Sequence, residues 1–408
     1  MTEIETIRDN CCSDKEGLAE VGLNKTMKTL PMFTPQKEED VDVCCGPKPA
    51  PRSHPLEKPG YRIMPFVEDF ISTANGPVPR VKTDLDFSDR METILVRLGI
   101  NRNNYKVSPG LYAIGRPDLN SVVLITANYK LSFDTLRKEL RGLNAWLLVL
   151  DTRSVNVWCA AGKKNFSSEE VIHQAKRNNL EKIVSHRKLI LPQLAATGVS
   201  ALKVKKGCGF EVIWGPIRAK DIKPFLAAGF KAEKSMRQVT FKMSERLVLT
   251  PVEISQTLKV LIWLVPLIFL LSGFGPAVFS VSGLLHRGVP AALAVVLGVI
   301  SGALLTPAFL PWIPFRAFSL KGALAGLIVG LGLSLLYLRP LVFMPTLALI
   351  LLTGTLSSYL AMNFTGCTPF TSPSGVEKEM RKAIPIQSAA AGLGLILWFI
   401  SAFISIAI

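Results

Sequence analysis

The sequence contains no pair of cysteines with the C-x-x-C spacing that is typical of iron–sulfur clusters and structural zinc sites. We therefore expect neither kind of site in this chain. An apolar core near the N-terminus is also missing, because the chain opens with Met1-Thr2-Glu3-Ile4-Glu5. This opening predicts no secretory signal peptide and a cytoplasmic soluble part, where structural disulfides are rare.

A basic stripe is missing as well, although the formal net charge is +16. The lysines and arginines are scattered along the chain, which argues against nucleic acid as a partner. A basic surface that faces an anionic membrane explains the charge better.

Acidic residues become rare after about Ser255, where Leu, Ile, Val, Ala, Gly and Phe dominate. Several apolar stretches there approach the roughly 20 residues that a helix needs to cross a bilayer. We predict a mobile tail over residues 1–60, a cytoplasmic domain over 61–250 and a transmembrane domain over 251–408. The predicted spans are 258–273, 289–305, 322–338, 341–362 and 388–408.

The charges between these spans predict their orientation. Basic residues are concentrated on the side of the N-terminal domain, in agreement with the positive-inside rule. We therefore expect a multi-pass protein of the cytoplasmic (inner) membrane, with its N-terminal domain in the cytoplasm and its C-terminus outside. The inner cations are Arg316, Lys321, Lys378, Arg381, Lys382 and those of the stretch 231–259, and the outer ones are Arg287 and Arg339.

Ionisable residues inside a span would favour transport. His286, Arg287 and Arg339 all fall at the ends of the predicted spans. Anchoring and partner docking are therefore the favoured roles of the spans, and transport with a regulatory soluble domain is a minority hypothesis.

Between residues 61 and 243, predicted strands alternate with predicted helices, which indicates an α/β, Rossmann-like domain with a mostly parallel sheet. Ligands of such sheets bind at the carboxyl ends of the strands. Charged residues of the predicted helix 133–143, among them Arg137 and Arg141, are expected on its outer face. The predicted strands are 111–115, 121–126, 145–150, 188–191, 201–204, 211–214 and 238–243, and the predicted helices are 167–177, 133–143 and 219–228.

A lone cysteine, Cys159, follows the predicted strand 145–150 at the start of a short helical turn. A helix N-terminus and the two lysines after the turn both favour a thiolate. A buried structural role is the usual one for an isolated cysteine. Here the small residues that follow leave room for a large flat partner, and Trp158 can cover an apolar ring. A nucleophile would need a base, and nothing in the sequence ties His173 or His186 to Cys159.

The run Asn156–Lys163, N-V-W-C-A-A-G-K, closely resembles the cap-helix motif of the membrane-bound corrinoid proteins that methylate mercury in anaerobic bacteria and archaea. The resemblance extends to the layout of one soluble domain followed by five spans. The segments Gly110–Gly115 and Gly215–Asp221 resemble the corrinoid-binding domain of the large subunit of the corrinoid iron–sulfur protein of the acetyl-CoA pathway.

This resemblance implies a methyltransferase that passes a methyl group from the cobalt of a corrinoid (cobalamin-type) cofactor to Hg(II) and so forms methylmercury. It makes Cys159 the catalytic residue, as the lower axial ligand of cobalt. Lys163 has a blander alternative role at a solvated helix edge, as does Lys164. The other implied cofactor contacts are Asn156, Val157, Trp158, Ala160, Ala161, Gly162, Lys163, Gly215 and Pro216.

The chemistry explains why this ligand should be a cysteine. The methyl group must leave toward Hg(II), an electrophile, with carbanion or radical character. A thiolate on the opposite side of the cobalt donates more charge than neutral imidazole and favours that departure. The chain also lacks the D-x-H-x-x-G signature of histidine-ligated cobalamin proteins.

Loss of a methyl carbanion leaves the cobalt in need of two electrons at low potential, which this chain has no cluster to supply. The resemblance names the reductant as a ferredoxin-like membrane-associated partner with two [4Fe–4S] clusters. It traces the methyl group to methyltetrahydrofolate through a separate methyltransferase.

The remaining cysteines are interpreted more simply. Cys208 is expected in a loop near a strand end, and Cys367 in an inner loop, with a relay of mercury as its less favoured role. The vicinal pairs could capture Hg(II), because thiolates are soft ligands, but incidental cysteines in a tail are favoured. These pairs are Cys11-Cys12 and Cys44-Cys45.

The sequence leaves one main alternative. The same domain could serve as a membrane-tethered corrinoid methyl carrier of one-carbon and acetyl-CoA metabolism, with mercury an incidental acceptor.

Overall fold

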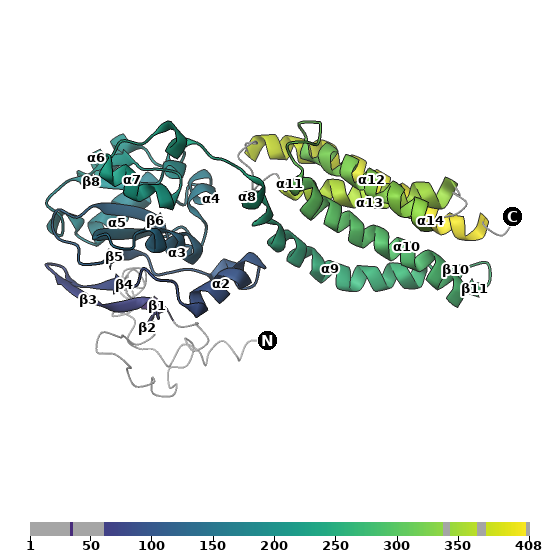
Figure 1. Cartoon of the computed structure of the whole chain (residues 1–408), viewed down its shortest axis with the longest axis horizontal. Helices are drawn as coiled ribbons and strands as arrows, with labels where there is room; N and C mark the ends of the chain where they lie inside the picture. Colours follow the sequence, from purple (N-terminus) through teal and green to yellow (C-terminus); the bar gives the residue numbers. More distant parts are fainter. Residues whose placement is uncertain (1–32, 36–60, 338–342, 365–372, 405–408) are drawn as a thin grey trace, which may run out of the picture. The chain divides into compact units, whose positions relative to one another are not determined.

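The computed structural model describes residues 33–35, 61–337, 343–364 and 373–404, and Figure 1 shows their helices and strands. The chain separates into two compact units. The α/β unit comprises Met1–Thr93 and Asn103–Gln238, and the helical unit comprises Ile94–Arg102 and Val239–Ile408. Of the predicted tail over 1–60, only Phe33–Pro35 (β1) is described, and it pairs with Tyr61–Ile63 (β2).

The α/β unit is built on a seven-stranded sheet with the strand order β3-β4-β5-β7-β6-β8-β9. Strands β7, β6, β8 and β9 run parallel to one another, and β4 is parallel to β5. Two pairs are antiparallel, β3 with β4 and β5 with β7. The sheet is therefore mixed: four of its six strand pairs are parallel, as predicted for most of the sheet, and the two antiparallel pairs were not foreseen. The strands are β3 (Val67–Thr73), β4 (Gly76–Val81), β5 (Gly110–Ile114), β6 (Val123–Ala127), β7 (Ala145–Leu150), β8 (Lys188–Leu191) and β9 (Glu211–Trp214).

Helices cover both faces of this sheet (Figure 1). Because successive side chains of a strand point to opposite faces, Leu111 and Ala113 of β5 join one core with α5 and α6, while Tyr112 and Ile114 join a second core with α3 and α7. This double burial explains why the strands are almost purely apolar. The helices are α2 (Phe87–Arg97), α3 (Lys130–Glu139), α4 (Val157–Gly162), α5 (Ser168–Arg177), α6 (Ala201–Cys208) and α7 (Ile222–Ala227), with 3-10 turns η1 (Arg102–Asn104), η2 (Leu180–Lys182), η3 (Gln193–Ala195), η4 (Ala219–Asp221) and η5 (Lys234–Arg237).

Two predicted strands are wrong. Residues 201–204 lie in α6, because the Ser200 hydroxyl caps the helix by accepting a hydrogen bond from the Lys203 amide. Residues 238–243 form no strand. There the Glu245 carboxylate accepts a hydrogen bond from the Lys242 amide and starts α8 (Met243–Leu247).

The predicted exposure of Arg137 is also wrong, because α3 buries this side chain completely. Its guanidinium donates to Asp134 at 2.8 Å and to Asp89 at 2.6 Å. Lys130, also buried, lies 2.7 Å from Asp89 and 2.9 Å from Asp134. Two cations and two carboxylates therefore balance one another inside the unit, as buried charges must.

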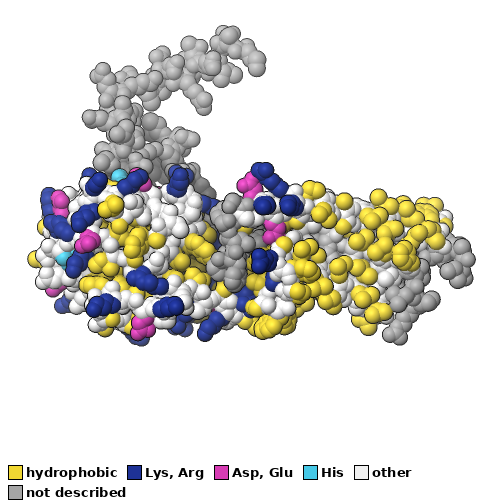
Figure 2. All heavy atoms as spheres, turned by 90° about the horizontal axis from the view of Figure 1, so that it is seen from above, with side chains coloured by type: hydrophobic (Ala, Val, Ile, Leu, Met, Phe, Trp, Pro, Cys, Tyr) yellow, Lys and Arg dark blue, Asp and Glu magenta, His cyan; other side chains and the backbone are white. Residues whose placement is uncertain are grey.

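In the helical unit, five of the described helices are long and apolar enough to cross a membrane. Each overlaps a predicted span. Figure 2 shows apolar side chains spread over much of this unit, whereas Lys and Arg are found on the α/β unit and on only part of the helical unit. A short hairpin of β10 (Phe274–Gly275) and β11 (Val278–Phe279) joins the first two of these helices, α9 and α10. The helices are α9 (Thr250–Leu271, continuing from α8), α10 (Val281–Ile300, continuing through the π-helical η6, Ser301–Leu305, into α11, Thr306–Ala308), α12 (Phe318–Tyr337), α13 (Phe343–Asn363) and α14 (Pro373–Ile404).

Small residues let α12 and α13 approach closely. A Cβ on Gly326 would lie 2.6 Å from the Ser357 Cβ, so only glycine fits there. The Ser357 hydroxyl donates to the Gly322 carbonyl at 2.7 Å. Gly322, Gly326 and Gly330 recur every four residues, which is the spacing that membrane helices use for close packing.

Two expectations about charges near the spans are corrected. Helix α10 begins at Val281, so His286 and Arg287 lie on its second turn rather than at its end. The cations at 378, 381 and 382 belong to the first turns of α14 rather than to a loop, because the helix begins at Pro373. Arg339 lies outside the described residues.

Replacing Asp134 by Ala leaves two buried cations with fewer partners, so we expect the α/β unit to lose about 3 kcal/mol of stability. Hydrogen exchange of the full chain, followed by mass spectrometry over α3 and β7, measures this loss. Arg141→Ala is the matched control, because its ion pair with Asp84 is solvent-exposed and should contribute little. Equal exchange in both variants would contradict the proposed role of the buried cluster.

Candidate functional site

The candidate site lies where parallel strands end together. Ala127, the last residue of β6, pairs with Leu150, the last residue of β7. Strand β8 lies on the other side of β6. The loops that follow these strands therefore leave the same edge of the sheet, where ligands of α/β domains bind.

Helix α4 stands at this edge and contacts β6 and η3, the turn that follows β8. The Asn156 side chain caps the helix, because its Oδ1 accepts a hydrogen bond from the Cys159 amide at 2.9 Å. Ala160 and Ala161 are buried in the core shared with α5 and α6. Their burial turns the other side of the first turn outward, and both Trp158 and Cys159 are exposed.

The turn between β7 and α4 is strained, and the Asn128 side chain makes several of the hydrogen bonds that hold it. Arg153 and Ser154 both have positive φ, 56° and 61°, which costs on the order of 1–3 kcal/mol for each residue that is not glycine. Asn128, directly after β6, accepts hydrogen bonds from the amides of Thr152 and Ser154 at 3.1 and 3.2 Å. Its amide group donates to Asp151 at 3.0 Å. Asn128 thus fixes the turn that aims α4.

A second contact fixes the far end of α4. A Cβ on Gly198, in the loop after η3, would lie 2.9 Å from the Ala161 carbonyl and closer still to the Phe166 carbonyl. Only glycine lets the two backbones meet there. The loops after β7 and β8 are therefore packed together as one surface.

The structure places the predicted site residues in two groups. The run from Asn156 to Lys163 forms α4 with both of its caps, and Lys163 is the C-cap. Gly215 and Pro216 are buried at the end of β9, where the Gly215 amide donates to the Leu191 carbonyl at 2.8 Å. Strand β8 separates β9 from β6 in the sheet, so these two residues lie at the same edge, two strands away from the β6 end.

Sequence reasoning missed Asn128 and the strained turn. The available signal was an asparagine directly after the apolar strand Val123–Ala127, since asparagine is common where a chain turns.

The other cysteines differ from Cys159. Cys208 ends α6 instead of lying in a loop, its thiol donates to the Val204 carbonyl, and burial raises its pKa. Cys159 is exposed and forms no disulfide. The cysteines at 11, 12, 44, 45 and 367 lie outside the described residues.

His186 does not serve as a base for Cys159. Its Nε2 lies 2.9 Å from the carbonyl of Ser121, which precedes β6 and so belongs to the opposite, amino edge of the sheet. His186 and Cys159 therefore lie toward opposite edges of the sheet.

Comparison with known proteins concerns the same region. Residues 90–226 match the family profile of the CO dehydrogenase/acetyl-CoA synthase delta subunit. The chain is 33% identical over 141 residues to the gamma subunit of the acetyl-CoA decarbonylase/synthase complex of Archaeoglobus fulgidus, over 33% of this chain and 30% of the relative. The gamma subunit of Methanocaldococcus jannaschii is 38% identical over 110 residues, which are 26% of this chain and 22% of the relative.

The corrinoid/iron–sulfur protein large subunit of Moorella thermoacetica is 29% identical over 189 residues, covering 41% of each chain. The chain therefore spans less than half the length of each relative named here. The profile match contains β5 to β9 together with α4, and it ends before α8 and α9 begin.

Replacing Asn156 by Ala removes the cap of α4, and we expect this helix to lose about 1 kcal/mol. Amide exchange over residues 157–163 should quicken by roughly fivefold, because fewer native amides stay protected. Asn156→Ser keeps a capping oxygen and serves as the control. If both variants exchange alike, the cap does not hold the helix.

Proposed function

We propose that this chain binds a corrinoid against the carboxyl edge of β6, β7 and β8 and transfers a methyl group from it. The observation that carries the proposal is the exposed thiol of Cys159 on the first turn of α4, within the segment that matches the acetyl-CoA synthase subunit family. The relative named as a corrinoid/iron–sulfur protein supports the choice of cofactor.

The residues present fit such a group. A thiolate is a soft ligand suited to a transition metal, and the Cys159 sulfur is accessible because α4 buries its alanines instead. Trp158, exposed beside it, offers an aromatic surface to an apolar ring system. The bound corrinoid supplies a cobalt centre that accepts a methyl group and passes it on.

Residues of the chain around α4 would position the Cys159 thiol for cofactor binding. Asn128 holds the strained turn, and Asn156 fixes the first turn of α4 through the Cys159 amide. Val157, partly buried, packs against the core and limits rotation of the helix. Lys163 lies at the C-cap and is solvent-exposed, so its proposed cofactor contact would come from its side chain.

Two methyl acceptors follow from different observations. The relatives are named for acetyl-CoA complexes, and they support a methyl carrier of one-carbon metabolism as the main assignment. The cysteine at position 159 supports Hg(II) as a second acceptor. A thiolate ligand at this position would donate charge to the bound metal, which would favour methyl transfer to an electrophile.

The proposed partners follow from what this sequence does not carry. It has no C-x-x-C pair to hold a cluster, so we propose an external reductant, a ferredoxin-like protein with two [4Fe–4S] clusters. The methyl group would come from a methyltetrahydrofolate-linked donor. The five long apolar helices would insert in the cytoplasmic membrane, with the α/β unit in the cytoplasm and the C-terminus outside.

Replacing Cys159 by Ala should leave the fold intact, because the side chain is exposed, but should change the absorption spectrum of the corrinoid-loaded protein and abolish more than nine-tenths of methyl transfer. Cys208→Ala is the matched control, since it also removes one free thiol and should keep both properties. Cys159→His tests ligand identity. Full activity of Cys159→Ala would sink the axial-ligand assignment.

The acceptor is decided by supplying the reduced, methylated full chain with Hg(II) and, separately, with an acetyl-CoA synthase preparation. We expect label from a ¹⁴C-methyl donor to reach acetyl-CoA if the chain is a one-carbon carrier, and methylmercury if Hg(II) is the evolved acceptor. Chromatographic separation of the two products measures the ratio. No bound cobalt, together with solute flux in vesicles, would favour the transport hypothesis instead.

A further inference from the structure

Helix α14 carries a continuous stripe of exposed side chains that changes character along its length. Lys378 and Lys382 are one turn apart, and Ile386 follows one turn later and is 70% exposed. The stripe continues in steps of three, four or seven residues, which keep it on one face of a helix. Its remaining large exposed members are Leu393, Ile396 and Ile400.

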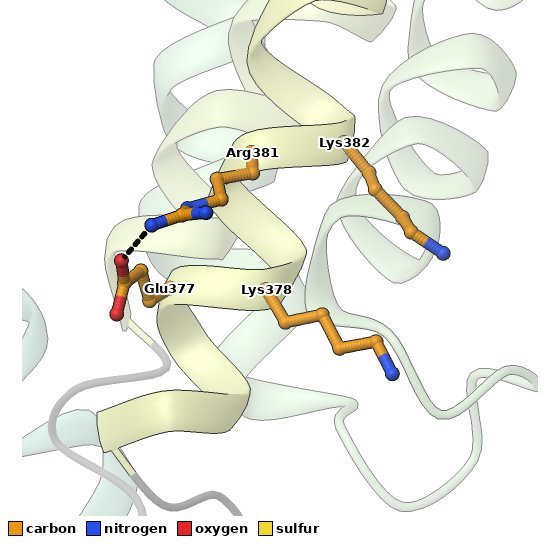
Figure 3. Close-up of a pocket in the computed structure, with 4 residues that line it drawn as sticks. All are labelled: Glu377, Lys378, Arg381 and Lys382. Atoms are coloured by element: carbon orange, nitrogen blue, oxygen red, sulfur yellow. Dashed lines mark hydrogen bonds and ion pairs between the residues drawn. The ribbon is translucent and has the colours of Figure 1, made fainter.

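The two lysines at the head of the stripe have no counter-charge within the described residues. Glu377 forms an ion pair with Arg381, and the Arg381 Nη2 lies 2.7 Å from the Glu377 Oε1 (Figure 3). Glu379 accepts a hydrogen bond from the Ser319 amide at 2.7 Å. Figure 3 shows Lys378 and Lys382 extending away from the Arg381–Glu377 pair.

Their position on the helix adds to this imbalance. The two lysines stand four residues apart on α14, and like charges at this spacing on a helix repel each other. A hollow of about 350 Å³ adjoins them, lined by Glu377, Lys378, Arg381 and Lys382. An anion from outside the chain would satisfy this arrangement.

The apolar part of the stripe restricts what kind of anion fits. Ile386 stands one turn, about 5.4 Å, beyond Lys382, so a ligand with charge at one end and hydrocarbon at the other matches both parts. A free inorganic anion would use only the lysines. The stripe therefore has the polarity of a phospholipid that lies alongside the helix.

We propose that Lys378 and Lys382 bind the phosphate of an anionic glycerophospholipid, whose acyl chain lies along Ile386, Leu393 and Ile396. Basic pockets at the cytoplasmic ends of membrane helices commonly bind anionic headgroups. This inference rests on the membrane insertion proposed above. It assigns the first turns of α14 to the headgroup layer of the cytoplasmic leaflet.

The test is a titration of the purified full chain in neutral detergent with phosphatidylglycerol, with the bound lipid counted by native mass spectrometry. Lys378→Gln/Lys382→Gln should weaken lipid binding roughly 25-fold, because each lysine near an anionic headgroup contributes about fivefold. The control is Glu377→Gln/Arg381→Gln, which removes an ion pair from the same hollow without changing its net charge and should keep the affinity.

Two further arms decide the source of the anion. Phosphatidylcholine should bind at least tenfold more weakly than phosphatidylglycerol, and glycerol 3-phosphate should not displace the bound lipid at equal concentration. Equal binding of both lipids, unchanged binding by the lysine variant, or displacement by glycerol 3-phosphate would each overturn the proposal.

Alkaline extraction of membranes that contain the full chain separates this failure from that of the insertion itself. Both the wild type and the lysine variant should stay in the membrane pellet, because the apolar helices carry insertion. Release of both would refute insertion, whereas retention of both with equal lipid binding would refute the headgroup site alone.

Discussion

The hydrogen bonds made by the Asn128 side chain are the interaction on which the candidate site depends. They join the end of β6 to the turn after β7, where Arg153 and Ser154 hold the left-handed conformation. The Ser154 hydroxyl adds a bond to the Tyr105 carbonyl, and Gly198 packs against the far end of α4. Contacts from the ends of neighbouring strands thus place the first turn of α4, with Cys159, at the carboxyl edge.

The two faces of the sheet bury different kinds of side chain. On one face, α4 packs through Ala160 and Ala161 against the core that includes α5 and α6, and small side chains keep it close to the strand ends. On the other face, α3 buries the charged cluster of Arg137, Asp134, Asp89 and Lys130. Both faces thus contribute buried contacts to the fold, and the exposed Cys159 thiol takes no part in them.

Much of this organisation could be predicted from the sequence, for a physical reason. Strands β7, β8 and β9 were predicted with the bounds that the structure shows, because each is a short, largely apolar run followed by a turn residue: Asp151, Pro192 and Gly215. The start of α5 was also predicted, since Ser167 caps it by accepting from the Glu170 amide. The Cys159 turn was found at the start of a short helix after β7, as expected.

The failures have equally physical causes. Residues 201–204 are mostly apolar, as in a short strand, but Ser200 and Gly209 cap a helix there, with Gly209 at φ 79°. Arg137 looked like a surface residue because no local pattern reveals Asp89, 48 positions away in the sequence. Asn128 was missed for the same reason, since its partners follow a different strand. Interactions between distant segments decide burial and turn geometry, and periodicity carries no information about them.

The position of Cys159 bears on how a thiolate could serve a metal that changes its number of ligands. A buried ligand would be held by packing on every side, whereas this thiol is held only through the backbone of a six-residue helix, with one cap at 2.9 Å. If the proposed corrinoid binds at this edge, Cys159 would be the residue to hold its cobalt. An exposed thiol could reach such a group without the local unfolding that a thiol enclosed in the core would need.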